Sequence, residues 1–271
     1  MAVPELYDHV IVPFDGSLPA RAGLTPAADL AWRCGARIVI VNSTEASDRA
    51  SRQAVKSMAM ALSGADVDFW VDTDRSLGQA LVEAARFRSR PVICVPIRRR
   101  EGGLRKRPLL TATPAEVLLD APCPVLVIGP ETEIDRGLPL QELVVALDGS
   151  AASESMLELA VCWARALRLG IVLVGVVPDL PDADHEPEQV YLERHLHSLA
   201  TTVPELDVSV ELVGAADPVD GLIYVLAKRQ DSVLVMSTHG RGGLDRYPLG
   251  RVAQATMLRS PRALLFRRPS S

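Results

Sequence analysis

A glycine-rich stretch late in the chain has the residue types of a phosphate-binding loop. It reads Ser237-Thr238-His239-Gly240-Arg241-Gly242-Gly243-Leu244, and Gly250-Arg251-Val252 follows a few residues later. Glycines let backbone N–H groups approach an anion closely, and a helix starting near Gly250 would direct the positive end of its dipole to the same place. This pattern predicts a site for a phosphate-bearing ligand. A tight loop that needs glycines only for its turns is the alternative.

An aspartate at the end of an apolar run offers a second polar group. Asp148 follows Leu143–Leu147, Asp15 follows a similar run near the start, and Gly-Ser comes after each aspartate. The two copies are 148 − 15 = 133 residues apart, about half of the 271 residues. Since solenoid units are only about 20–50 residues long, this repeat predicts two tandem domains of one fold. We place them at residues 1–130 and 140–271.

The elements that carry these motifs alternate in type. Short runs of Val, Ile and Leu, typical of strands buried on both faces of a parallel sheet, alternate with helix-like stretches. The alternation predicts an α/β fold with two tandem, doubly wound, five-stranded parallel-sheet domains. The expected strands are His9–Val12, Arg37–Val41, Val67–Val71, Val92–Val95 and Val125–Ile128, then Leu143–Leu147, Ile171–Val177, Val208–Val213, Val233–Met236 and Ala263–Phe266. Because ligands of such sheets bind beyond the carboxyl ends of the strands, Asp148 and the glycine-rich loop are expected to meet there.

Capping residues set the expected helix ends. Serine or aspartate can accept backbone N–H bonds where a helix begins, and glycine commonly follows the last helical residue. The expected N-caps are Ser17, Ser150 and Asp217, and the expected terminating glycines are Gly35 and Gly170. A later helix is expected over Val190–Leu199, and the boundary between the halves within Pro130–Pro139.

The composition excludes several classes of function. The formal net charge of −5 gives no support to nucleic-acid or membrane binding. No apolar stretch reaches the roughly 20 residues of a membrane helix, and no secretory signal is expected at the start. The four cysteines, Cys34, Cys94, Cys123 and Cys162, fall outside any metal-binding spacing. The expectation is a cytoplasmic protein with reduced thiols.

Catalytic residues do not stand out. His195 and His197 are two residues apart in a helix-like stretch, so they do not share a face and make a poor metal pair. Asp15 and Asp148 belong to separate halves and form no obvious acid/base pair. The sequence contains no Gly-x-Ser-x-Gly nucleophile motif. We therefore predict no catalytic residue and no metal site built by the protein alone.

Three features of the sequence resemble the universal stress protein (UspA) family. They are the Asp-Gly-Ser motif near the start of each half, the segment Ala121–Val127 and the Met236–Leu244 loop. The resemblance covers both halves and implies a tandem two-domain member. It also implies five-stranded α/β domains similar to nucleotide-binding hydrolase domains. One branch of the family binds ATP through a Gly-x2-Gly-x9-Gly-Ser/Thr motif. The resemblance thus implies ATP as the ligand, with Mg²⁺ accompanying it.

In the second half the family motif matches with two departures. Ser237 occupies the position of the first glycine of the motif. Arg251 occupies the position of the Ser or Thr that contacts phosphate in the family. Asp148 matches the carboxylate that the family places against the ribose and adenine side. Whether Arg251 binds the phosphates or fills the pocket is left open. The nucleotide-binding set that the resemblance implies is Ala146, Asp148, Val176, Ser237, Gly240, Gly250, Arg251 and Val252.

The first half has diverged further from the family. Its matching positions are Pro13, Asp15 and Ser43. However, the loop over residues 95–112 lacks the first two motif glycines, so we expect this half to have lost the ordinary ATP cradle. The arginine runs Arg98–Arg100 and Arg105–Arg107 have two interpretations, an anion site or a solvated surface loop.

Three functions remain in competition. The leading hypothesis is a stress-response or signalling protein that binds ATP in the second half with little or no turnover. The alternative is a scaffold or interaction protein that has lost the ligand, and a slow ATPase is the third hypothesis. The resemblance also implies that the last strands of the two halves, Val125–Ile128 and Ala263–Phe266, pair with each other. A homodimer is left open.

Overall fold

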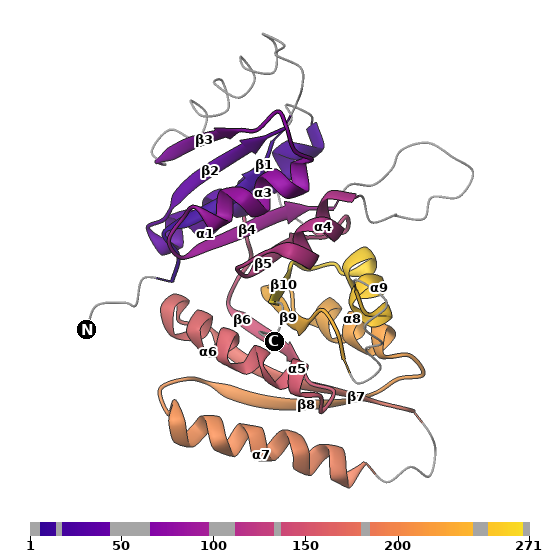
Figure 1. Cartoon of the computed structure of the whole chain (residues 1–271). Helices are drawn as coiled ribbons and strands as arrows, with labels where there is room; N and C mark the ends of the chain where they lie inside the picture. Colours follow the sequence, from indigo (N-terminus) through magenta and orange to yellow (C-terminus); the bar gives the residue numbers. More distant parts are fainter. Residues whose placement is uncertain are drawn as a thin grey trace.

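The computed structural model describes residues 6–14, 18–43, 66–97, 112–132, 137–179, 185–240 and 249–267 (Figure 1). The first half contains β1 (His9–Pro13), α1 (Leu18–Cys34), β2 (Arg37–Asn42), β3 (Val67–Val71), α3 (Leu77–Arg86), β4 (Pro91–Pro96), α4 (Ala112–Asp120) and β5 (Val125–Ile128). The second half contains β6 (Glu142–Ala146), α5 (Ala151–Glu154), α6 (Met156–Leu167), β7 (Gly170–Val177), α7 (Glu186–Thr202), β8 (Val208–Gly214), α8 (Pro218–Lys228), β9 (Ser232–Ser237), α9 (Arg251–Arg259) and β10 (Leu264–Arg267).

The strands form one sheet in the order β3-β2-β1-β4-β5-β10-β9-β6-β7-β8. Paired strands within each half are parallel, as crossover helices require. Strands β5 and β10 pair in antiparallel orientation, with Leu126 opposite Leu265. The predicted α/β class is confirmed, and every expected strand is present with its ends within one residue. The two five-stranded sheets are continuous through the β5–β10 pair.

Helices cover both faces of this sheet. Helices α1, α6 and α7 pack on one face, and α3, α4, α8 and α9 pack on the other. Each apolar core includes residues of both halves. Leu138, from the stretch expected to separate the halves, and Leu140, just after it, are buried in the first of these cores. The described end of the connecting segment, residues 137–140, is therefore packed against the core.

Among the described residues, the helix ends agree with the predicted caps except at one position. The Ser150 hydroxyl accepts the N–H of Ser153 at the start of α5, and the Asp217 carboxylate accepts that of Val219 in α8. Gly35 has a φ of +63° after α1, as expected. The prediction for Gly170 is wrong, because Arg168 takes the left-handed conformation after α6 and Gly170 already belongs to β7. Ser17 lies outside the described residues.

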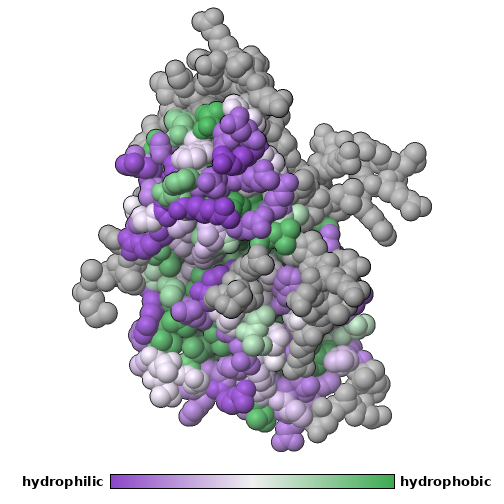
Figure 2. Space-filling model, in the orientation of Figure 1, coloured by the Kyte–Doolittle hydropathy of each residue, from purple (hydrophilic) through white to green (hydrophobic). Residues whose placement is uncertain are grey.

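The surface, the helix lengths and the cysteine thiols bear on the expectations drawn from the composition. On the face seen in Figure 2, hydrophobic residues form separate groups among hydrophilic ones. Among the described helices, none is both long enough and apolar enough to cross a membrane. Burial raises the pKa of the Cys94 and Cys123 thiols to about 12, so these two are inert near neutral pH.

Candidate functional site

The carboxyl edge of the second-half sheet brings several predicted residues together. Strands β6 and β9 are parallel neighbours, with Val145 opposite Val235, so their carboxyl ends emerge side by side. Asp148 follows the first strand, and the second ends at Ser237. The apolar residues Ala146 and Val176 pack toward the face covered by α8 and α9.

Asp148 is held by the first turn of the helix that follows it. Its Oδ1 accepts hydrogen bonds from the N–H of Ser150 (3.0 Å) and from the Ser150 hydroxyl (2.6 Å). Its own N–H donates to the Ser153 hydroxyl at 3.3 Å. Sequence reasoning missed Ser153, for which the signal was a second serine in the first turn of a helix. This network fixes the carboxylate beyond the end of β6.

Gly240 lies directly against that carboxylate. A Cβ atom at Gly240 would overlap Oδ2 of Asp148, so a larger residue would require the carboxylate to move. Gly240 thus allows a close approach between the glycine-rich loop and Asp148. Residues 241–248, the centre of the loop, lie outside the described residues.

The N-terminus of α9 closes the same edge. The N–H of Gly250 donates to the Thr238 carbonyl at 2.8 Å, and a Cβ at Gly250 would lie 3.1 Å from that oxygen. Gly250 stands at the N-cap position and makes no side-chain cap hydrogen bond. The first-turn N–H groups of a helix with such an N-terminus can bind an anion. Arg251 and Val252 occupy the first turn with exposed side chains.

Ser237 and Val176 have supporting roles. The Ser237 hydroxyl donates to the His239 carbonyl, which directs it into its own loop rather than toward a ligand. Val176 packs against α8, where a Cβ added to Gly221 would come within 2.6 Å of its Cγ1. Gly221 is a further residue that sequence reasoning missed. Val176 and Ala146 together form an apolar wall on the α8 side of the edge.

The predicted first-half positions are only partly described. Pro13 ends β1 and is buried, and Ser43 follows β2 and is partly buried. Asp15, Arg98–Arg100 and Arg105–Arg107 lie outside the described residues. Sequence reasoning missed Asp72, a buried carboxylate just after β3. A hydrogen bond from Arg75 (2.7 Å), aided by the N–H of Asp74, lowers the pKa of this carboxyl group.

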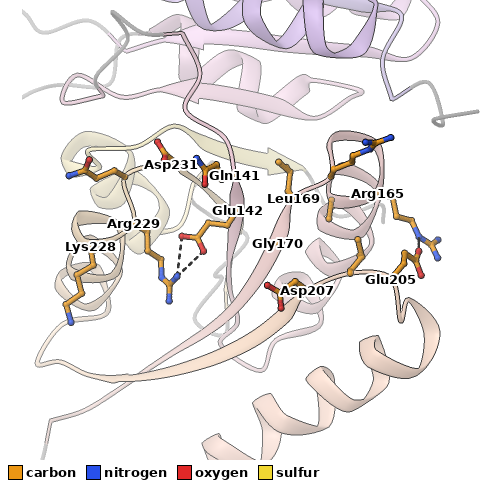
Figure 3. A pocket seen from close by; sticks show the side chains of 14 residues that line it. Gln141, Glu142, Arg165, Leu169, Gly170, Glu205, Asp207, Lys228, Arg229 and Asp231 are labelled. Carbon is orange, nitrogen blue, oxygen red and sulfur yellow. Dashed lines mark hydrogen bonds and ion pairs between the residues drawn. The ribbon is translucent and has the colours of Figure 1, made fainter.

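A broad groove of about 1120 Å³ lies at the opposite, amino edge of the second-half sheet (Figure 3). Its charges are largely matched within the protein. Arg229 donates to Glu142 (2.9 Å) and to Glu211 (2.8 Å), and these bonds, Glu211 first, raise the pKa of Arg229. Arg165 pairs with Glu205 at one end of the groove. These pairs give the groove no preference for anions.

Metal-binding side chains do not gather in the described part of the chain. No group of three or more His, Cys, Asp or Glu residues is placed to hold an ion there. His239 contacts the Thr238 hydroxyl at 3.1 Å within the glycine-rich loop. His195 and His197 lie on α7, as the sequence predicted.

The second half is similar in sequence to proteins of one known family. The model of the universal stress protein family matches residues 139–266. Residues 139–266 are thus similar to the universal stress protein family. Curated universal stress proteins of Mycobacterium tuberculosis and Mycobacterium bovis are 30% identical over 166 residues, covering 57% of this chain and 55% of theirs. The chain thus spans about half the length of the curated universal stress proteins that it matches.

Solved structures support the universal stress protein fold over both halves. A universal stress protein from Archaeoglobus fulgidus has a TM-score of 0.69 at 18% identity, covering 97% of this chain and 99% of that one. A putative universal stress protein from Pseudomonas aeruginosa has a TM-score of 0.65 at 18% identity, covering 97% and 94%. At this identity the likeness concerns the fold alone.

Proposed function

We propose that the second half binds an adenine nucleotide, ATP in the first place, with little or no turnover, as part of a stress response. The observation that carries the proposal is the packing of Gly240 against the Asp148 carboxylate. In this proposal the Asp148 carboxylate accepts hydrogen bonds from the ribose hydroxyls, and the first turn of α9 binds the phosphates.

Each part of a nucleotide has a chemical counterpart at this edge. The N–H groups of α9 suit phosphate oxygens, and the exposed guanidinium of Arg251 can bind phosphate in bidentate fashion. The apolar wall of Ala146 and Val176 suits the face of a base. Mg²⁺ would arrive with the phosphates. Little turnover is proposed because neither the sequence nor the described site offers a residue assigned to activate water.

Calorimetric titration with ATP, ADP and AMP tests this function. The Asp148→Ala substitution should weaken the binding of all three nucleotides by about tenfold or more, because the contacts with the ribose are lost. Gly240→Val should abolish binding, since its side chain would overlap Asp148. Asp207→Ala, an exposed aspartate at the opposite edge, is the matched control and should bind normally. Absence of binding for all three nucleotides at millimolar concentration would remove the proposal.

A second candidate is an interaction protein without a nucleotide. It is favoured by the exposed aromatic side chains Trp32 and Phe87, which are 81% and 70% exposed on the first half. Under this alternative, Gly240→Val would leave the cellular role intact. A survival assay of stressed cells that carry only the Gly240→Val protein separates the two functions.

A further inference from the structure

Strand β3 forms one end of the sheet (Figure 1), and among the described strands only β2 pairs with it. The Asp66 carbonyl accepts a hydrogen bond from the Ile38 N–H, and the Asp72 N–H donates to the Asn42 carbonyl. Because backbone groups of a strand point alternately to its two sides, every second residue between Asp66 and Asp72 directs its N–H and C=O groups away from β2. These outward-facing residues are Val67, Phe69 and Val71.

The same residues of β3 combine backbone groups outside the sheet ladder with exposed apolar side chains. The Phe69 N–H donates to the carboxylate of the neighbouring Asp68 at 2.8 Å rather than to another strand. The Phe69 side chain is 39% exposed, and that of Val71 is 68% exposed. Since an edge strand of this kind is a template on which a further strand can pair, β3 is a candidate interaction surface.

The other end of the sheet offers a comparison within the same chain. Strand β8 takes the place of β3 in the second half, and each pairs in parallel with the second strand of its own half. Val210 and Leu212 of β8 correspond to Phe69 and Val71. Both are partly buried and pack against the core on the face covered by α7. The apolar side chains are therefore largely covered at β8 and exposed at β3.

The residue pattern of β3 suits pairing with a second copy of itself. Its apolar residues read the same in both directions, as Val-x-Phe-x-Val. In antiparallel pairing centred on Phe69, Phe69 faces its counterpart and Val67 faces Val71. Asp68 then faces Trp70, so like charges do not oppose each other within the strand. A two-fold axis makes such a contact self-complementary and closed.

From this geometry we infer that β3 is a dimerisation edge, at which two copies of the chain pair in antiparallel orientation about a two-fold axis at Phe69. The sheet continues from one copy into the other, and the exposed side chains of Phe69 and Val71 are covered. Pairing replaces the bond between the Phe69 N–H and Asp68, so we expect a weak dimer with a Kd of about 10–100 µM. The inference stands on β3 and does not depend on whether a nucleotide binds.

Sedimentation equilibrium of the full chain between about 1 and 200 µM tests the pairing. The wild type should show a reversible dimer. Val71→Lys should raise the Kd by about tenfold or more, because it sets a charge against an apolar side chain of the second copy. Ser209→Lys adds the same charge at an exposed position of β8 and is the matched control, which should dimerise like the wild type.

Three results of this experiment would overturn the inference. The first is a monomer over the whole concentration range, and the second is a dimer that Val71→Lys leaves unchanged. The third is growth beyond the dimer, because pairing of β3 with β8 of the next copy would not close.

A cross-link tests the register in a Cys162→Ser background, which lacks the exposed native thiol. Phe69→Cys should place two thiols opposite each other at the two-fold axis. The Cα atoms of such a hydrogen-bonded pair are about 5.5 Å apart, which a disulfide can span. Oxidation with diamide should then give a covalent dimer, whereas Ser209→Cys should stay monomeric. Equal cross-linking of the two variants would mean that the copies do not meet at β3, and this readout decides the question should Val71→Lys fail to fold.

Discussion

The indole Nε1–H of Trp163 in α6 donates a hydrogen bond of 2.7 Å to the hydroxyl of Tyr7, which lies just before β1. Both residues are buried, and their rings meet edge to face with centroids 5.9 Å apart. This contact joins the second half to the first through the core, in addition to the β5–β10 strand pair. The two halves are therefore expected to unfold together.

Trp163→Phe tests the contribution of this hydrogen bond. Phenylalanine keeps an aromatic ring but leaves the buried Tyr7 hydroxyl without its donor and opens a small cavity. We expect the free energy of unfolding to fall by about 2–4 kcal/mol, measured by urea unfolding. Trp32→Phe, which alters an indole that is 81% exposed, is the control and should change it by less than about 0.5 kcal/mol. Equal effects of the two substitutions would contradict the assignment.

Asp72→Asn should destabilise the protein in a pH-dependent way. Because the pKa of the folded Asp72 carboxyl is lowered, chiefly by Arg75, its charged form stabilises the fold above the ordinary aspartate pKa of about 3.9. That stabilisation is lost as the pH falls through the lowered pKa. The difference between wild type and Asp72→Asn should thus be largest near neutral pH and vanish in strong acid. Asp74→Asn, in the same loop, is the control and should show a smaller difference near neutral pH; chemical denaturation at several pH values makes the comparison.

A pair of glycine substitutions tests the packing behind Val176. In Gly221→Ala the new methyl group would press on the stiff side chain of Val176. Overpacking should outweigh the better helix propensity of alanine, for a net loss of about 1–2 kcal/mol. In Gly170→Ala the nearest atom is 3.7 Å away, so the stability should change by less than about 0.5 kcal/mol. If the two variants have the same Tm, the contact between α8 and β7 is looser than described.

Arg251→Ala addresses the position where the family motif expects a hydroxyl. The exposed guanidinium lies in the first turn of α9, so its removal should reduce ATP affinity about tenfold and AMP affinity by less than about twofold. Arg259→Ala, at the other end of the same helix and paired with Asp220, should bind ATP normally. Tighter ATP binding by Arg251→Ala would instead mean that Arg251 obstructs the site.

The strands could be predicted because their signal is local. Continuous Val, Ile and Leu runs such as Ile38–Val41 are buried on both faces of the sheet and need no information from elsewhere in the chain. The end of α6 could not be predicted in the same way. Residue type alone favours Gly170 over Arg168 for a left-handed conformation, and only the start of β7 decides against it.

Contacts between residues far apart in the sequence could not be predicted either. The repeat and the glycine spacing led to Asp148, Gly240 and Gly250. The contacts of Glu154 with Tyr191 and His195 join residues about 40 positions apart, and no periodicity links them. Gly221 behind Val176 was missed for the same reason, since its importance comes from packing between a helix and a strand.

The antiparallel junction of β5 with β10 also decides the directions in which the two halves face. Since all strands within one half are parallel to each other, the carboxyl ends of the first half emerge on the side opposite to Asp148. A molecule that binds near Ser43 and a molecule that binds near Asp148 would therefore approach from opposite edges of the sheet. Two ligands bound at these positions would not compete sterically. Any coupling between the two positions would have to act along the length of the strands.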